Sequence, residues 1–357
     1  MSGKVDILVG GQYGSEGKGK ASYFIAKNGT YGKPYGAFVR GGGENAGHTF
    51  YDDDKDKHVT QVVPVGAFVD EAKIFVGPGS VFTTKQLFKE MDESGCHDRI
   101  LIDRNAGVIT EEHKDIEAAL SLSDKIGSTA HGCGAAMASK VMRNGFLTAK
   151  DYKELSPYVG NVPMAINGVL RSGKDVFLEG TQGTLLSLDH TLEYPYATSR
   201  NATSSAIAAE CGVGPKDIRH IILTLRTFPI RVGGNSGPAK GREMTWDEMM
   251  KRSRKAYPEL TTVTKKTRRV FEFSMEELRY AIMLNTPTHI AMMFADYFND
   301  ENAGVSCLED LTHDISDWMA DMWDETGIDI GLIGTGPHNR DMVNLGPWSG
   351  HPEDWHE

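Results

Sequence analysis

The sequence lacks several features that would place the protein in other functional classes. No apolar run approaches the roughly 20 residues needed to cross a membrane, and the N-terminus has no apolar region typical of a signal peptide. The four cysteines show neither C-x-x-C spacing nor the spacing of metal ligands: Cys96, Cys133, Cys211 and Cys307. These absences predict a cytoplasmic protein with reduced thiols and no membrane partner.

An excess of positive charge is also absent. The chain carries 38 Lys and Arg against 49 Asp and Glu, and a net charge of −11 argues against a nucleic-acid partner. We expect the dense basic cluster at residues 251–255 to be the solvated face of a helix. The sequence has no internal repeat, low-complexity tract or long linker, and its 39% hydrophobic residues can form a large core.

Short apolar runs alternate with helical stretches along the chain, a pattern typical of an α/β protein. The expected strands are residues 5–9, 37–40, 74–76, 100–102, 176–178, 221–225, 289–294 and 328–333. The expected helices are residues 84–93, 111–123, 245–257, 275–284 and 308–326. We therefore predict one large domain over residues 1–357, built around a mostly parallel central sheet.

A glycine-rich loop at residues 10–20 follows the first expected strand. Glycines let the backbone approach a ligand, while N–H groups at the start of the next helix and the Lys18 ammonium attract anionic oxygens. The loop is not a standard P-loop, which needs glycine where Gln12 stands and a hydroxyl where Gly19 stands, and a Rossmann fingerprint carries no lysine. Taken alone, the loop leaves a phosphate site and a plain strand-to-helix turn open.

A second glycine-rich cluster, residues 41–49, follows the strand at residues 37–40. The carboxyl ends of parallel strands meet at one edge of a sheet, where loops gather around a ligand. The two clusters therefore predict one shared crevice. Within it, His48 is a candidate acid or hydrogen-bond donor.

The two loops, G-Q-Y-G-S-E-G-K-G-K and N-A-G-H-T, together resemble adenylosuccinate synthetase. Further matches cover most of the chain: residues 127–129, 140–143, 179–186, 194–199, 263–269 and 334–337. The resemblance implies that family's fold and a Mg²⁺-dependent, two-step C–N ligase. A nucleoside triphosphate phosphorylates O6 of a 6-oxopurine nucleotide, and the amine of aspartate then displaces the phosphate.

Ser15 departs from the family, which has aspartate at this position. That aspartate takes the purine N1 proton and helps to hold the metal, whereas an unassisted hydroxyl is not a base near neutral pH and is a weaker ligand. The shorter, neutral serine leaves space beside N1 and C2, where guanine carries an amino group. This resembles the phage branch, which makes 2-amino-N6-succinyl deoxyadenylate from dGMP on the route to diaminopurine DNA. The location would then be the host cytoplasm.

Three functions remain open at this stage. The first is a ligase that joins aspartate to dGMP, and the second is an ordinary adenylosuccinate synthetase that uses IMP and GTP. A carboxylate can also accept from both guanine N1–H and N2–H, so the size of Ser15 alone does not decide between them. The third is a nucleotide-binding sensor that has lost catalysis. The kept residues disfavour it: Lys18, His48, Gln182 and Arg268.

The resemblance implies the following site residues, although threonines and Gln182 in isolation are more typical of turns and caps. The catalytic residues would be Ser15, Lys18, His48 and Gln182. The nucleoside monophosphate would contact Ser15, Glu16, Gly17, Lys18, Asn45, Ala46, Gly47, His48, Thr129, Arg143, Gln182, Thr198 and Lys266. Arg143 corresponds to an arginine that reaches the neighbouring subunit's site, which implies a homodimer. Mg²⁺ would contact Ser15 and Gly47.

The remaining predicted residues bind the other two substrates. Aspartate would contact Val263, Thr264, Lys265, Lys266, Thr267 and Arg268. Arg268 is the strongest of these because a guanidinium offers a bidentate fork to a carboxylate, although this run also fits a solvated basic face. The triphosphate would contact Gly17, Lys18, Gly19, Gly47, His48, Thr49, Arg268, Phe294, Asp296, Gly334, Thr335 and Gly336. Phe294 replaces the lysine that reads the guanine of GTP, so we expect ATP, with GTP or dATP as alternatives.

Overall fold

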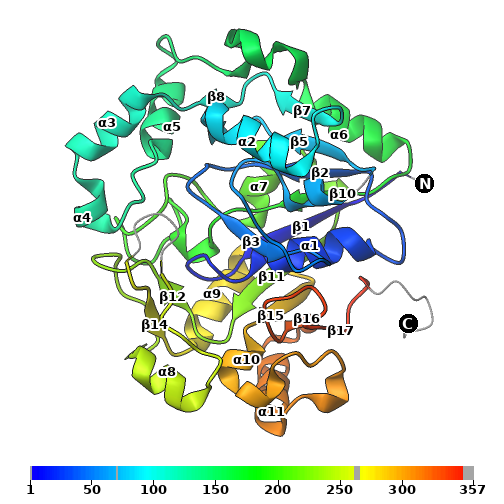
Figure 1. Cartoon of the computed structure of the whole chain (residues 1–357), viewed down its shortest axis with the longest axis vertical. Coiled ribbons are helices and arrows are strands. Elements are labelled where there is room, and N and C mark those ends of the chain that lie inside the picture. The colour runs from blue at the N-terminus through cyan, green and yellow to red at the C-terminus, as the bar shows by residue number, and fades with distance from the viewer. Residues whose placement is uncertain (1, 70, 261–265, 349–357) are drawn as a thin grey trace.

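A ten-stranded sheet forms the centre of the computed structural model, which describes residues 2–69, 71–260 and 266–348 (Figure 1). The strands lie in the order β17 (Met342–Asn344), β16 (Asp329–Gly334), β15 (His289–Met293), β11 (Ile218–Arg226), β1 (Val5–Gly10), β10 (Val176–Glu179), β2 (Ala37–Arg40), β5 (Lys73–Val76), β7 (Ile100–Asp103) and β9 (Val159–Gly160). Neighbouring strands are parallel except for β16 and β17, which are antiparallel. The predicted α/β class and mostly parallel sheet are confirmed.

Helices cover both faces of this sheet, which is why its central strands are buried along their whole length and rich in apolar residues. All six residues of β1 are buried, and alternate side chains enter different cores: Leu8 packs on one face, whereas Ile7 and Val9 pack on the other. The first face is covered by α1 (Lys18–Asn28) and α2 (Thr84–Ser94). The second is covered by α6 (Val162–Arg171), α7 (Ser204–Cys211) and α9 (Met275–Asn285).

Smaller elements surround the sheet. At one end of the molecule lie α3 (Glu111–Ala119), α4 (Leu122–Ile126) and α5 (Cys133–Met142), and at the other end lie α8 (Trp246–Arg252), α10 (Ala295–Phe298) and α11 (His313–Thr326) (Figure 1). Short strands form three further sheets: β3 (His48–Tyr51) with β4 (Lys57–Thr60), β6 (Val81–Phe82) with β8 (Gly107–Val108), and β12 (Ile230–Arg231) and β13 (Glu243–Met244) on either side of β14 (Arg269–Phe271). No helix of the described residues is both long and apolar enough to span a bilayer.

The expected strands all form, with ends that shift by up to three residues. The largest shift is in β11, which begins at Ile218 instead of residue 221. The expected strand at residues 289–294 ends one residue early, because Phe294 takes a left-handed backbone with φ 66°. The strand prediction works because buried parallel strands are short, uniformly apolar and bounded by glycine.

Three expected helices are wrong in extent. The stretch 111–123 is divided into α3 and α4 by Ser121, whose φ is 53°. The stretch 245–257 is helical only to Arg252, because Ser253 is extended and buried and its hydroxyl donates to the Asp296 carbonyl oxygen at 2.6 Å. The stretch 308–326 contains a 3₁₀ turn, Leu308–Asp310, and α11 begins only at His313.

The basic residues of the cluster at 251–255 are exposed, as we expected, but they do not share one helix face. Arg252 ends α8, and its guanidinium lies 4.4 Å from the centre of the Phe298 ring. The next residue, Ser253, is buried, and Arg254 pairs with Asp300 at 2.5 Å. Arg252 therefore contacts the end of α10, and Arg254 contacts the segment that follows it, which the sequence did not indicate.

A buried histidine lies in β11, away from the glycine-rich loops. The ring of His220 packs against His289 and Trp348, with ring centres 5.2 and 6.2 Å away, and neither of its nitrogens has a hydrogen-bond partner among the described residues. Burial, which is the largest cause, lowers the pKa of His220 to about 4. The folded protein therefore holds this imidazole neutral at physiological pH.

We predict that His220 makes the protein less stable in mild acid. An unfolded histidine has a pKa of about 6.5. Between about pH 6.5 and about pH 4, His220 is protonated in the unfolded chain but stays neutral in the folded protein. The free energy of unfolding therefore falls as pH is lowered through that window. In His220→Phe, the loss between neutral pH and about pH 5 should shrink by about 1–2 kcal/mol, measured by urea unfolding at both pH values. An unchanged pH dependence would contradict the assignment to His220.

Candidate functional site

A cavity of about 1370 Å³ opens at the carboxyl edge of the central sheet. It is larger than the roughly 300–1,000 Å³ of a typical small-molecule site, so it has room for more than one ligand. Loops that follow five parallel strands contribute to its lining, among them Lys18 after β1, Asn45 after β2, Gln182 after β10, Val232 after β11 and Phe294 after β15. The shared crevice predicted from the two glycine-rich clusters is present.

The carboxylate of Glu16 fixes the loop that follows β1. This side chain is fully buried, and its Oε1 accepts from the Gln12 and Gly14 N–H groups at 3.1 and 2.8 Å. Its Oε2 lies 2.5 Å from the Lys18 ammonium, which is also buried. Lys18 begins α1, and Gly17 before it is left-handed with φ 87° and provides no side-chain cap. The first N–H groups of α1 therefore remain available to an anion.

The loop after β10 packs directly on this phosphate loop. A Cβ atom on Gly183 would lie 2.3 Å from the Gln12 carbonyl oxygen and 2.4 Å from the Glu16 carboxylate, so only glycine fits there. The preceding residue, Gln182, has a left-handed backbone with φ 65° and lines the cavity. The close packing of these two loops places Gln182 beside the turn that carries Lys18.

His48 is held by a carboxylate that the sequence did not single out. Its Nδ1 lies 2.6 Å from Glu179 Oε1, and Arg40 Nη1 lies 2.6 Å from the same oxygen. The other Glu179 oxygen accepts from the Val65 N–H at 2.8 Å. All three side chains are buried. Glu179 is the last residue of β10 and stands in the run at 179–186 that carried the family resemblance, which is the signal that could have revealed it.

The protein groups around His48 keep its imidazole neutral. Burial, and after it the nearby Arg40 cation, lower the pKa of His48 to about 4. Since Nδ1 faces the Glu179 carboxylate, the proton of the neutral ring belongs on Nδ1, and the Nε2 lone pair is left without a partner among the described residues. The predicted role as a donor therefore requires a second proton. An anionic oxygen beside Nε2 would raise the pKa and favour that form.

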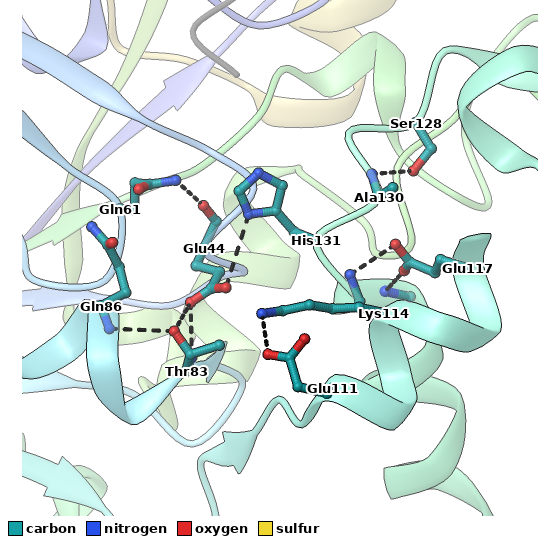
Figure 2. A network of polar contacts seen from close by, with 12 residues as sticks. Glu44, Gln61, Thr83, Gln86, Glu111, Lys114, Glu117, Ser128, Ala130 and His131 are labelled. Atoms are coloured by element: carbon teal, nitrogen blue, oxygen red, sulfur yellow. Dashed lines mark hydrogen bonds and ion pairs between the residues drawn. The ribbon is translucent and has the colours of Figure 1, made fainter. Parts of the chain in front are cut away.

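Residues 127–131 form another wall of the cavity, to which Thr129 and His131 contribute. Figure 2 shows that His131 points toward Glu44. His131 Nδ1 lies 3.9 Å from Glu44 Oε1. The other Glu44 oxygen accepts from the Thr83 N–H and hydroxyl at 2.7 and 2.9 Å. Glu44 is thus fixed at the start of α2 and faces the wall that carries Thr129. Sequence reasoning passed over both Glu44 and His131.

A second carboxylate supports the same wall from behind. Glu117 Oε2 accepts from the Gly132 N–H, and its Oε1 accepts from the Gly134 N–H, both at 2.8 Å (Figure 2). Ala130, within the wall, has a left-handed backbone with φ 53°, and its N–H donates to Ser128 Oγ at 3.2 Å. The wall is therefore fixed by carboxylates on two sides.

Ser15 lies exposed in the cavity with a left-handed backbone, φ 59°. Its hydroxyl accepts a short hydrogen bond from Arg268 Nη1, and its carbonyl oxygen accepts from Arg226 Nη1 at 3.2 Å. Arg226 is fully buried, and its guanidinium lies 3.8 Å from the centre of the Phe294 ring. Two cations therefore flank the position where the family has an aspartate.

The far end of the cavity is aromatic. Phe294 lines it together with Tyr257 and Tyr297, and the Phe294 and Tyr297 ring centres are 5.2 Å apart. Asp296 lines the same end, where burial raises the pKa of its carboxyl group. The Lys20 ammonium holds the opposite loop by donating to the Gly336 carbonyl oxygen at 2.6 Å. A flat, polar-edged ring such as a nucleobase fits this chemistry.

Most of the predicted site residues meet in this cavity. Those that line it are Ser15, Gly17, Lys18, Gly19, Asn45, Ala46, Gly47, His48, Thr49, Thr129, Gln182, Thr198, Arg268, Phe294, Asp296 and Gly336. Glu16 is buried behind them. Val263, Thr264 and Lys265 lie outside the described residues.

Five predicted residues do not contribute to the lining in the single chain. Lys266 and Thr267 are exposed, and Gly334 is the last residue of β16. Thr335 is buried, and its hydroxyl donates to the Val305 carbonyl oxygen at 2.6 Å, so it supports the loop from inside the protein. Arg143 lies at the exposed end of α5, where its Nε donates to the Val141 carbonyl oxygen at 3.3 Å.

The donor set at Ser15 is compatible with magnesium bound mainly through a substrate. Among the described residues, no group of three or more His, Cys, Asp or Glu side chains could hold a metal ion. Ser15 offers one neutral hydroxyl, and Gly47 is exposed nearby in the same cavity lining. Mg²⁺ commonly takes few protein ligands and completes its shell with phosphate and water oxygens, which fits these residues.

We predict that Gly183→Ala damages the site through the phosphate loop. The added methyl group must displace Gln12 or Glu16, which should cost about 1–3 kcal/mol of unfolding free energy and weaken nucleotide binding by tenfold or more. Gly168→Ala in α6 is a matched control, because its Cβ would meet no atom within 4 Å, and it should be neutral or slightly stabilising. Thermal unfolding and calorimetric titration measure both effects, and equal behaviour of the two variants would contradict the prediction.

Comparisons with known proteins identify the family of the chain. Residues 7–153 and 147–303 match the adenylosuccinate synthetase family. The chain is 36% identical to adenylosuccinate synthetase of Methanococcus aeolicus, over 95% of this chain and 98% of that protein. The corresponding enzyme of Pyrococcus horikoshii is 35% identical, over 95% of this chain and 97% of that protein.

Two solved structures share the fold. Succinoaminodeoxyadenylate synthetase of cyanophage S-2L, bound to dGMP and to dATP as an energy donor, has a TM-score of 0.81 and 28% identity, over 96% of each chain. Fully ligated adenylosuccinate synthetase of Plasmodium falciparum has a TM-score of 0.83 and 19% identity, over 96% of this chain and all of that one. From the family match and the archaeal identities we conclude that the chain belongs to the adenylosuccinate synthetase family, the ligases that join aspartate to a purine nucleotide.

Proposed function

We propose that this ligase joins L-aspartate to C6 of dGMP and forms 2-amino-N6-succinyl-2′-deoxyadenylate, with ATP converted to ADP and phosphate. The observation that carries the proposal is Ser15, a short neutral side chain where the family has aspartate, drawn toward Arg268 by a hydrogen bond. The similarity to a phage enzyme that binds dGMP and dATP supports it. Such a product belongs to a diaminopurine pathway, and a phage-encoded protein would act in the host cytoplasm.

The geometry around Ser15 favours a base with a substituent at C2. An aspartate at this position would extend further into the cavity and bring a negative charge. The serine hydroxyl is smaller and already accepts from Arg268, so it leaves room for an exocyclic amino group. This argument concerns the base alone, and the deoxyribose preference rests on the likeness to the phage enzyme.

The chemistry has two steps. The γ-phosphoryl group of the donor moves to O6 while the N1 proton leaves, and the amine of aspartate then attacks C6 and expels phosphate. Lys18 and the N–H groups at the start of α1 would hold phosphate oxygens, and protonated His48 would donate to the transferred group. Gln182 would orient the same group from the neighbouring loop. Magnesium bound at Ser15, Gly47 and the phosphates would offset the charge on that group.

Phe294 and Arg143 support two further proposals, one about the phosphoryl donor and one about the oligomeric state. The Phe294 side chain offers an aromatic face to either purine. Unlike the family's lysine, it carries no charge that could bind guanine O6, which supports ATP or dATP over GTP. Arg143 lies outside the cavity beside Val141 and Met142, whose side chains are 71% and 72% exposed. Exposed apolar side chains next to an arginine are typical of an interface, and we propose a homodimer in which Arg143 reaches the partner's monophosphate site.

An ordinary synthetase that uses IMP and GTP is the second candidate. The identity of 35–36% to archaeal adenylosuccinate synthetases favours it. Both candidates share the cavity, the phosphate loop and His48, and they differ in what Ser15 allows at C2 of the purine.

We predict turnover with guanine nucleotides. The protein is incubated with Mg²⁺, aspartate, ATP or GTP, and each of IMP, dIMP, GMP and dGMP, and phosphate release and the ultraviolet spectrum are followed. The highest kcat/KM should be with dGMP and ATP, because the cavity beside Ser15 accommodates the 2-amino group. Turnover with IMP alone would refute the guanine proposal, and tight binding without turnover of any nucleotide would support a sensor.

A further inference from the structure

The loss of the family's aspartate leaves the N1 proton without an obvious acceptor at Ser15. Three carboxylates line the cavity within the described part of the chain: Glu117, Glu259 and Asp296. Both Glu117 oxygens already accept from backbone N–H groups of residues 132–135, which follow the wall at the start of α5. Asp296 lies at the aromatic end, next to Lys20 and the Gly336 loop. Glu16 is fully buried with both oxygens engaged.

Glu259 is different because it lies next to Ser15. Its Oε1 pairs with Arg226 Nη2 at 2.6 Å, whereas its Oε2 lies 3.4 Å from Nη1. The same Nη1 donates to the Ser15 carbonyl oxygen at 3.2 Å. One guanidinium nitrogen therefore faces both the Ser15 backbone and the less engaged oxygen of Glu259. That oxygen keeps lone pairs free for another donor.

A second link ties Glu259 to Ser15 from the other side. The Glu259 carbonyl oxygen accepts from the Arg268 N–H at 2.8 Å, and the Arg268 guanidinium donates to Ser15 Oγ. Arg226 itself is immobilised, because it is fully buried and stacked on Phe294. Arg226 thus holds the Glu259 carboxylate and Arg268 holds its backbone, and both arginines also bond to Ser15, while the Glu259 side chain stays 17% exposed.

We propose that Glu259 supplies the carboxylate that Ser15 lacks and accepts the N1 proton of the purine during phosphoryl transfer. This inference rests on the proposed ligase function. The N1–H bond breaks and the proton moves to Glu259 Oε2, while the N1–H electron pair forms the N1=C6 bond and the C6=O π pair moves onto O6. The C6 oxygen then bonds to the γ-phosphorus, whose bond to the bridging oxygen breaks, and the nucleoside diphosphate leaves. The carboxylate is regenerated when it releases the proton to water.

The experiment compares Glu259→Gln with Glu259→Asp. Glutamine keeps the length and can still accept from Arg226, but it cannot take the proton, whereas aspartate is shorter and keeps a carboxylate. We expect kcat with dGMP to fall by about 10²–10⁴-fold in Glu259→Gln and by less in Glu259→Asp. The KM for dGMP should change by less than about threefold in Glu259→Gln, because binding does not need the base. A purely structural role would reverse the order of the two variants.

The pH profile provides a second readout. The deficit of Glu259→Gln should shrink in alkaline solution, because guanine N1 then loses its proton to solvent before phosphoryl transfer. Glu243→Gln is the matched control: Glu243 also pairs with an arginine, Arg269, at 2.5 Å, but lies outside the cavity lining. It should keep wild-type kcat and pH dependence.

Three outcomes would overturn the proposal. The first is a wild-type kcat in Glu259→Gln. The second is a decrease in the kcat of Glu259→Gln that does not change with pH. The third is a pH-dependent decrease in the kcat of Asp296→Asn that Glu259→Gln does not show. Failure of the dGMP proposal is distinguishable, because it would show in the wild-type protein as turnover of IMP alone. The same pair of variants then tests Glu259 with IMP, since hypoxanthine also carries the N1 proton.

Discussion

The buried carboxylate of Glu16 is the interaction on which the site depends. It accepts two backbone N–H groups of its own loop and holds the Lys18 ammonium at 2.5 Å, so it sets both the turn after β1 and the position of the cation that we propose binds phosphate. A buried charge pair of this kind is costly to break, because either partner alone would be left desolvated. The close approach of Gly183 then places the Gln182 loop on this turn. Ser15 precedes Glu16 in this loop, so the hydrogen bonds of Glu16 also fix the backbone that exposes Ser15 to the cavity.

The charges around this anchor indicate a site that is completed by its ligands. Lys18 and Arg268 face the cavity, the position of the family's aspartate is neutral, and His48 is neutral because burial and Arg40 lower its pKa to about 4. In the proposed reaction, the negative charge of bound phosphates would raise the pKa of His48, favour its protonation and balance the cations. The Glu179 carboxylate keeps the ring oriented in both protonation states, since it stays bonded to Nδ1.

Much of the fold could be predicted from the sequence, because buried parallel strands are short apolar runs that end in glycine-rich loops. The two clusters that resemble the family meet in one cavity, as their positions after β1 and β2 predicted. Helix ends were less predictable: Ser121 interrupts one helix and Ser253 ends another through backbone conformations and buried bonds that periodicity does not reveal. Glu179, Arg226 and Glu259 were missed because their roles depend on partners far away in the chain.

The central claim is that Ser15 sets the choice of purine. Its most direct test is the ratio of kcat/KM for dGMP to that for dIMP in the wild-type protein, Ser15→Asp and Ser15→Ala. The account predicts that aspartate lowers the ratio by about tenfold or more, equivalent to about 1.4 kcal/mol, because it fills the space beside C2, and that alanine preserves the preference for dGMP. An equal ratio in the wild-type protein and Ser15→Asp would contradict it.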